Sequence, residues 1–353
     1  MRYFSPSEAV MPAIERTRRF LFQSFDLVTY LKLTAVACIT EGFSANFNFS
    51  SHIHPSTGDV VPSLLSLSDE FLVLLVIAIV AAILAGLFFF YLVNRLRFAF
   101  FHCLLQQTTE IRPGWSLYRA QAERLFEAGL IIWAIFLVLA TIVVVPFFLE
   151  FWRVFQSVKS GVHFDLHGFI LLVLPFIGIV VLLCLIAGTV DVVVHDFILP
   201  HMALDDATFR EAWRAARAHI GREKGSFFFY LLLRLVLPVI AMLVLLISAG
   251  IPLIGAFGIL MLCAAGFRSL FDGSTLLSSV FGVFFEVLFG FVGLAVGLFV
   301  AFGLGGPVAT WVRNYALLFY GGRYKALGDI LSPPLPLPPT PNPTFDAGAP
   351  KIA

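Results

Sequence analysis

Five long runs of apolar residues dominate the chain. Each is at least as long as the ~20 residues with which an α-helix crosses a hydrocarbon core of about 30 Å. They alternate with segments in which charged residues gather. This pattern predicts an all-α, polytopic helical membrane protein in which residues 1–330 form one integral membrane domain. The five runs are 71–93, 129–149, 169–190, 226–249 and 276–304.

A sixth span is expected at 27–43, although this run is less apolar than the others. Lys32 lies near its start and Glu41 near its end. Long charged side chains near the ends of a membrane helix can reach the polar interface while their stems stay in lipid. Both charges are therefore compatible with a crossing.

A further apolar run, 251–267, leaves the number of crossings open between six and seven. It is short, and Gly250, Pro252 and Gly255 interrupt its start. As a full span it makes seven crossings. As a re-entrant or interfacial element, which protein or water must cover, it leaves six.

Arginine and lysine gather in alternate connections, and this asymmetry predicts the orientation. The N-terminal segment and the segments 94–128 and 191–225 are rich in them, whereas 44–70 contains none. Basic connections stay in the cytoplasm. Arg313 and Lys325 extend the rule to the C-terminal segment, so both termini are expected in the cytoplasm. That requires an even number of crossings, and we favour six.

The basic segments resemble one another, which indicates an internal repeat. Trp115 precedes a span that opens at Gly129, and Trp213 precedes one that opens at Gly225; the tryptophans are 98 residues apart (213 − 115). The N-terminal segment is a weaker third copy. Similarity at a fixed period is what duplication leaves. The chain is therefore interpreted as three parallel repeats, each an amphipathic helix followed by two spans.

Composition agrees with lipid as the solvent. Of the 353 residues, 59% are hydrophobic and 13% are charged, whereas soluble domains carry roughly 25% charged residues. The formal net charge of +1 is uninformative as a sum, and neither composition nor residue spacing suggests a nucleic-acid partner. Residues 331–353 are rich in proline and are expected to form an extended, disordered tail.

The basic segment before the fifth span is predicted to be an amphipathic helix with an arginine face. Its arginines recur at spacings of four and three, so they share one side of a helix. Such a helix can lie in the headgroup layer, with arginine towards anionic lipid and tryptophan at the interface. Equally, it can pack as a cap on neighbouring helices. The interfacial candidates are Trp115, Trp213, Arg210, Arg214 and Arg217.

Two charges fall well inside apolar runs. Arg234 lies eight residues into its span and Glu286 lies ten residues into the next, at similar depths of about 12 Å and about 15 Å from opposite faces. Because charges in lipid are costly, they are expected to pair. The pair either locks two helices, which we favour, or lines an ion or substrate pathway.

Four residues near the end of the fourth span have the side chains of metal ligands: Asp191, His195, Asp196 and His201. Two histidines with two carboxylates can bind a transition metal. Residues of this kind at a helix end also hydrogen-bond one another or free backbone groups, and we favour that interpretation. No phosphate loop or nucleophile motif occurs, and no cofactor is expected.

Several segments resemble an uncharacterised family of bacterial multi-pass membrane proteins. That family is similar in layout to the membrane domain of some glycerophosphoryl diester phosphodiesterases. The resemblance implies a bacterial cytoplasmic membrane and no catalytic residues, because the phosphodiesterase chemistry belongs to a separate domain. The segments are RTRRFLF at 16–22, FDLVTYLKL at 25–33, DFILP at 196–200, EAW at 211–213 and RNYALLF at 313–319.

Three functions remain open at this point. A non-enzymatic membrane scaffold or envelope-organising component is favoured, because the repeats come without a catalytic constellation. A transporter or lipid-handling protein is the alternative, and a membrane-embedded metal-dependent enzyme is the least favoured. The expected partners are membrane lipids, with other membrane proteins or a second copy of the chain as further candidates.

Overall fold

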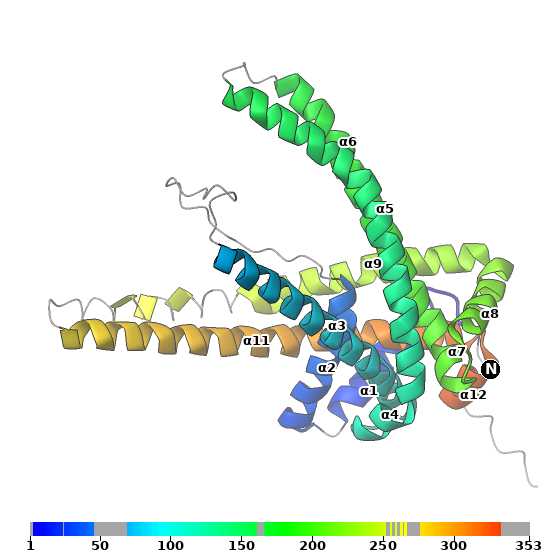
Figure 1. Cartoon of the computed structure of the whole chain (residues 1–353). Helices are drawn as coiled ribbons and strands as arrows, with labels where there is room; N and C mark the ends of the chain where they lie inside the picture. Colours follow the sequence, from blue (N-terminus) through cyan, green and yellow to red (C-terminus); the bar gives the residue numbers. More distant parts are fainter. Residues whose placement is uncertain are drawn as a thin grey trace, which may run out of the picture.

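A computed structural model of the whole chain is helical throughout its regular parts, and the described residues contain no strand (Figure 1). The all-α expectation is confirmed. The described residues are 3–23, 25–45, 69–160, 166–251, 276–332 and the single positions 255, 258, 259, 262, 263, 265 and 266. Most of the predicted element 251–267 and nearly all of the predicted tail 331–353 lie outside them.

The helices follow one another with short connections. In chain order they are α1 (Val10–Phe22), α2 (Leu27–Ala45), α3 (Asp69–Gln106), α4 (Arg112–Leu117), α5 (Arg119–Lys159), α6 (Leu166–Val192), the π-helix η2 (Val193–Ile198), α7 (Leu199–Leu204), α8 (Phe209–Arg222), α9 (Lys224–Leu245), the π-helix η3 (Leu246–Gly250), α11 (Leu276–Gly321) and α12 (Lys325–Leu331).

Five helical stretches of the described part are long and apolar enough to cross a membrane, which indicates a multi-pass membrane-associated protein. They overlap the five long apolar runs of the sequence. The helix α2, which covers the expected span 27–43, is not among them. The five stretches are Val73–Gln106, Arg119–Ser157, His167–Leu204, Lys224–Ser248 and Gly282–Gly321.

The long helices continue past their apolar runs into a packed region. Phe98 of α3, Phe197 of η2 and Phe319 of α11 are fully buried there, whereas the most apolar windows of the five stretches are almost entirely unburied. We call this packed region the base. It consists of α1, α2, α4, α7, α8 and α12 together with the C-terminal parts of α3 and α11, η2, and the adjoining first turns of α5 and α9.

Apolar helices diverge from the base in different directions. Figure 1 shows α5 and α6 running side by side to one end of the molecule, while α11 extends separately to another. The side chains along these arms are apolar and exposed, such as Ile142 of α5, Leu174 of α6 and Phe291 of α11. Apolar side chains are suited to contact with lipid, because the hydrocarbon core of a bilayer contains no water.

The closest helix crossing of the base joins α2 to α11. A Cβ atom on Gly306 would lie 2.1 Å from Thr34 Cβ and 2.6 Å from Thr34 Cα. One turn earlier along α11, the Tyr30 hydroxyl donates to the Gly303 carbonyl oxygen at 2.7 Å. Glycine therefore permits backbone contact here, as it does in other membrane helix pairs.

Candidate functional site: a buried ionic network

The base contains a buried network of charged side chains, built around a π-helix. α6 continues into η2, and this short π-helical stretch carries His195 and Asp196 into the interior. π-helical turns are rare and occur often at functional sites. The network is therefore the candidate functional site of the described residues.

Asp196 lies at the centre of the network. Its side chain is fully buried. One carboxylate oxygen accepts a hydrogen bond from Arg313 Nη1 at 2.8 Å. The other accepts from Arg234 Nε at 3.1 Å and from the Tyr230 hydroxyl at 2.8 Å. Three donors from two further helices thus satisfy one carboxylate.

Arg234 extends the network to α2. Its Nη2 donates to Glu41 Oε2 at 2.7 Å, and both side chains are about 85% buried. The other oxygen of Glu41 lies 4.0 Å from Arg313 Nε. Glu41 therefore neutralises its charge by ion pairing inside the base rather than by reaching a polar interface, as its position near the end of an expected span had indicated.

Arg97 of α3 forms the other half of the network. Its Nε donates to the Thr40 carbonyl oxygen at 3.1 Å, and its Nη1 donates to His195 Nε2. On the other side of the ring, His195 Nδ1 lies 2.8 Å from the Asp191 carbonyl oxygen and 2.9 Å from the Asp191 carboxylate. His195 therefore bridges Arg97 to Asp191.

The charges of the network balance. It contains the three arginines 97, 234 and 313 and the three carboxylates 41, 191 and 196, on α2, α3, α6 with η2, α9 and α11. Removing one partner of such a buried set leaves an uncompensated charge. The arrangement therefore holds five segments in one register.

The sequence identified part of this network. Arg234 and Asp196 were candidates, but they had been placed in different sites. The side chain of Glu286 lies outside the described residues, so its pairing with Arg234 stays a prediction. Sequence reasoning missed Glu41, Arg97 and Arg313 as members. They had been interpreted as interfacial or topological charges, although each lies in or beside an apolar run.

The four metal-ligand candidates do not form one cluster. Asp191 and His195 contact each other, and Asp196 is directed at arginines. His201 instead contacts the Asp205 carboxylate at 3.0 Å and the Tyr320 hydroxyl at 2.8 Å. Among the residues that the structure describes, no group of three or more histidine, cysteine, aspartate or glutamate side chains is arranged to hold a metal ion.

The interfacial candidates lie on the surface of the base. Arg210, Arg214 and Arg217 of α8 are exposed, and Trp213 beside them is 40% exposed. Trp115 of α4 is half-buried under the Arg95 guanidinium, which lies 4.4 Å from the centre of its ring.

The capping of α8 explains its local order. Thr208 and Glu211 form a capping box, in which Glu211 accepts hydrogen bonds from the side chain and backbone of Thr208. These hydrogen bonds hold the pKa of Glu211 below its usual range. The carboxylate is thus ionised and engaged at the N-terminus of the helix, where negative charge is favourable.

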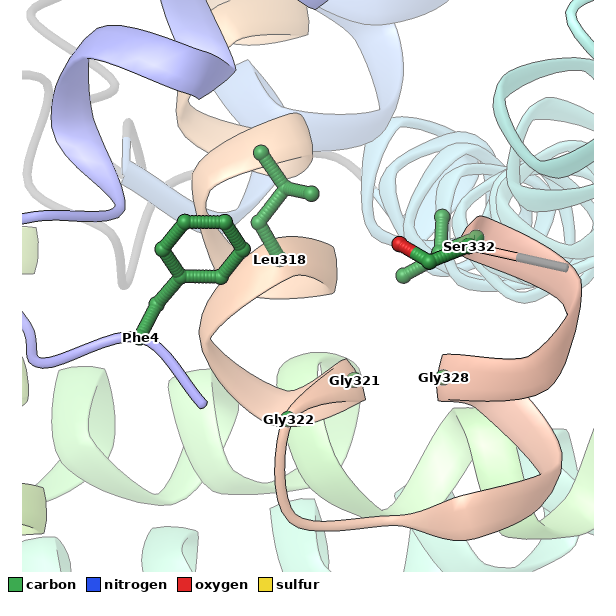
Figure 2. A pocket seen from close by; sticks show the side chains of 7 residues that line it. Phe4, Leu318, Gly321, Gly322, Gly328 and Ser332 are labelled. Atoms are coloured by element: carbon green, nitrogen blue, oxygen red, sulfur yellow. The ribbon is translucent and has the colours of Figure 1, made fainter. Parts of the chain in front are cut away.

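Cavities of the base offer little room for an enclosed ligand. Figure 2 shows one between Phe4, Leu318 and the glycines where α11 leads into α12. Its volume of about 10 Å³ holds at most a single water molecule. A larger hollow of about 500 Å³ at the end of α3 is open to solvent and lined by His102, Gln106, Gln107, Thr108, Thr109, Glu110 and Pro113.

Residues 4–330 match the model of a family of unknown function, DUF7544. The chain belongs to this family. Membership of DUF7544 agrees with the resemblance to an uncharacterised family, but it provides no link to the membrane domain of glycerophosphoryl diester phosphodiesterases. Comparison with curated proteins and with solved structures finds no match. The DUF7544 match covers the base and all five long apolar stretches.

Proposed function

We propose that the protein is a non-enzymatic membrane scaffold, in which a rigid base holds diverging membrane helices. The observation that carries this proposal is the closed ionic network. Each described charge in it has a partner of opposite sign, and its carboxylates and guanidiniums hydrogen-bond to one another. A transport pathway needs charges that an ion or substrate can reach, whereas a scaffold needs the locked register that this network supplies.

The contacts of the base support six crossings with both termini on one side. Arg16 of α1 donates to the Leu104 carbonyl oxygen at the end of α3, 2.8 Å away. Arg323, after α11, donates to Glu223 at 3.0 Å and to the Phe4 carbonyl oxygen at 3.1 Å. Groups in hydrogen-bond contact cannot lie on opposite sides of a bilayer.

An even number of crossings therefore separates each of these elements. We propose two crossings between α1 and the end of α3, two between α4 and α7, and two between α8 and the end of α11. This proposal assigns no crossing to 251–267. On this proposal the first crossing lies between residues 23 and 69, the part of the chain that contains the expected span 27–43.

The register of the long helices supports three parallel repeats. Arg97 and His195 are 98 residues apart and in contact, the same separation as that of Trp115 and Trp213. Arg313 is the proposed third equivalent. The five-residue segments 97–101, 195–199 and 313–317 that begin at these positions are buried throughout. On this proposal, equivalent positions of three repeats meet in the network.

The location proposed is the bacterial cytoplasmic membrane, with both termini in the cytoplasm and the base at the cytoplasmic side of the membrane. The concentration of arginine in the segments that form the base supports this side.

Water accessibility beside Glu41 tests the scaffold against a transporter. Cys38 lies three residues before Glu41, is half-buried and faces the Ala301 carbonyl oxygen at 3.8 Å. In a variant whose other three cysteines are replaced, we expect a membrane-impermeant thiol reagent to leave Cys38 unmodified from both sides. The network of a scaffold is dry, whereas a transport pathway admits water.

Two positive controls calibrate that experiment. Ser160 at the end of α5 and Ala218 on α8 are exposed. Ser160→Cys is expected to react from outside, and Ala218→Cys from inside. Reaction of Cys38 as fast as either control would overturn the scaffold and favour a transporter or lipid-handling protein.

A further inference from the structure

One face of α8 combines arginine and tryptophan. Arg210, Trp213, Arg214 and Arg217 follow the spacing i, i+3, i+4, i+7, which places them on one side of the helix. All four are exposed, and none of the three guanidiniums takes part in a hydrogen bond or ion pair with the described residues. We call these four residues the basic stripe.

Another side of α8 packs against the base. Ala212 and Ala216 are buried, as expected for a helix that packs with one side. Nearby carboxylates are already engaged, since Glu211 caps the helix and Asp206 pairs with Arg124 at 3.0 Å. The basic stripe therefore keeps an excess of positive charge, since only Glu211 beside Arg214 offsets part of it.

The position of α8 places the basic stripe beside a membrane surface. α8 ends at Arg222 and the apolar α9 begins at Lys224. Figure 1 shows the two helices meeting at a corner, so that α8 turns away from the direction of α9. Phe228 and Phe229 in the next turn of α9 are 71% and 45% exposed, as suits the start of a lipid-facing segment.

We propose that the basic stripe binds the headgroups of anionic phospholipids. The stripe and the phosphate group of such a lipid are complementary in charge. Guanidiniums form paired hydrogen bonds with phosphate oxygens, and tryptophan prefers the headgroup layer. The inference rests on the proposed membrane function, which it deepens by naming a lipid partner and the surface that selects it.

Lipid selectivity of the full-length protein in vesicles tests this site. The protein and the triple variant Arg210→Gln, Arg214→Gln, Arg217→Gln are reconstituted in phosphatidylcholine containing a trace of spin-labelled phosphatidylglycerol or phosphatidylcholine. The ratio of immobilised phosphatidylglycerol to immobilised phosphatidylcholine is measured by electron paramagnetic resonance. Each arginine at an anionic surface contributes roughly a fivefold preference, so we expect the ratio to fall at least about threefold in the variant.

A matched triple variant provides the control. Arg18 and Arg19 of α1 and Arg112 of α4 are exposed arginines outside α8, and their change to glutamine is expected to leave the ratio unchanged. Added salt should lower the preference of the wild type and of this control, but not that of the α8 variant.

Two results would overturn the lipid site: no preference in the wild type, or equal loss in both triple variants. Neither result changes the reactivity of Cys38, so failure of the lipid site and failure of the scaffold are distinguishable.

Discussion

At the scale of single residues, Asp196 lies at the centre of the contacts that join the base. Its two carboxylate oxygens accept hydrogen bonds from Arg313, Arg234 and Tyr230. A buried carboxylate without donors would be costly, and so would two buried guanidiniums without a carboxylate. Asp196 thus couples η2 to α9 and α11.

Replacing Asp196 by asparagine should strongly destabilise the protein. The change keeps the shape but leaves two arginines short of negative charge, so we expect a loss of roughly 3–5 kcal/mol in the free energy of unfolding. Unfolding by a denaturing detergent in mixed micelles measures it. Asp206→Asn is the control: the pair of Asp206 with Arg124 is exposed, and its loss should cost less than about 1 kcal/mol.

A second residue-scale prediction concerns acid. Burial lowers the pKa of His219 below its ordinary value of 6.5, and the nearby His201 and Arg222 lower it further, while Glu223 opposes them. The unfolded chain therefore binds this proton more readily than the folded one. The contribution of His219 to the free energy of unfolding is fully present above pH 6.5. It is lost as the pH falls below 6.5 through the lowered pKa of the folded state.

The measurement is the melting temperature at about pH 7.5 and about pH 5.5, on either side of the ordinary histidine pKa. His219→Gln should show a smaller drop than the wild type on acidification, because the variant lacks the titrating group. An equal drop in both proteins would show that other groups cause it.

At the scale of elements, Gly306 determines how closely α2 can approach α11. Gly306 leaves no space for a side chain against Thr34. By contrast, a Cβ atom on Gly297 of the same helix would meet nothing within 4 Å. The same residue type therefore has different consequences at two positions of α11.

Gly306→Ala should push α2 away from α11. Because the clash involves backbone and a β-branched side chain, we expect a loss of about 1–3 kcal/mol, measured by the same detergent unfolding. Gly297→Ala should be neutral or stabilising, since alanine favours helix by about 1 kcal/mol. If both variants lost stability alike, the close crossing would not exist.

At the scale of the whole molecule, the base joins segments from both ends of the chain. The hydroxyl of Tyr3 accepts a hydrogen bond from Arg323 Nη2 at 2.9 Å, and the Asn314 side-chain amide donates to the Thr17 hydroxyl, also at 2.9 Å. If the protein crosses a membrane as proposed, these contacts require its two ends to share one side.

Reporter fusions test that requirement. With the proposed six crossings, green fluorescent protein at the C-terminus should fluoresce in a bacterial host. Alkaline phosphatase at the same position should be inactive, because it matures outside the cytoplasm. The same pair of fusions at the N-terminus should give the same result. Active phosphatase at one terminus alone would contradict the even number of crossings.

Local pattern was sufficient for the class and for most helices. Runs such as 71–93 and 169–190 are recognisable because the cost of placing a peptide segment in lipid depends on that segment alone. The helical periodicity of Arg210, Arg214 and Arg217 is equally local, and the structure has them exposed as one face. The same local reasoning placed the ends of the apolar spans before the ends of the helices. α3 and α11 continue as buried segments that are no longer purely apolar.

The partners of the buried charges were decided by tertiary structure. Glu41 and Arg234 are 193 residues apart in the chain, and no periodicity relates positions so distant. A charge in an apolar run indicates that a partner of opposite charge is needed, but several carboxylates could pair with Arg234. Only the packing of α2, η2 and α11 around the end of α3 selects Glu41 and Asp196, because ion pairing in the interior depends on distances that the fold alone sets.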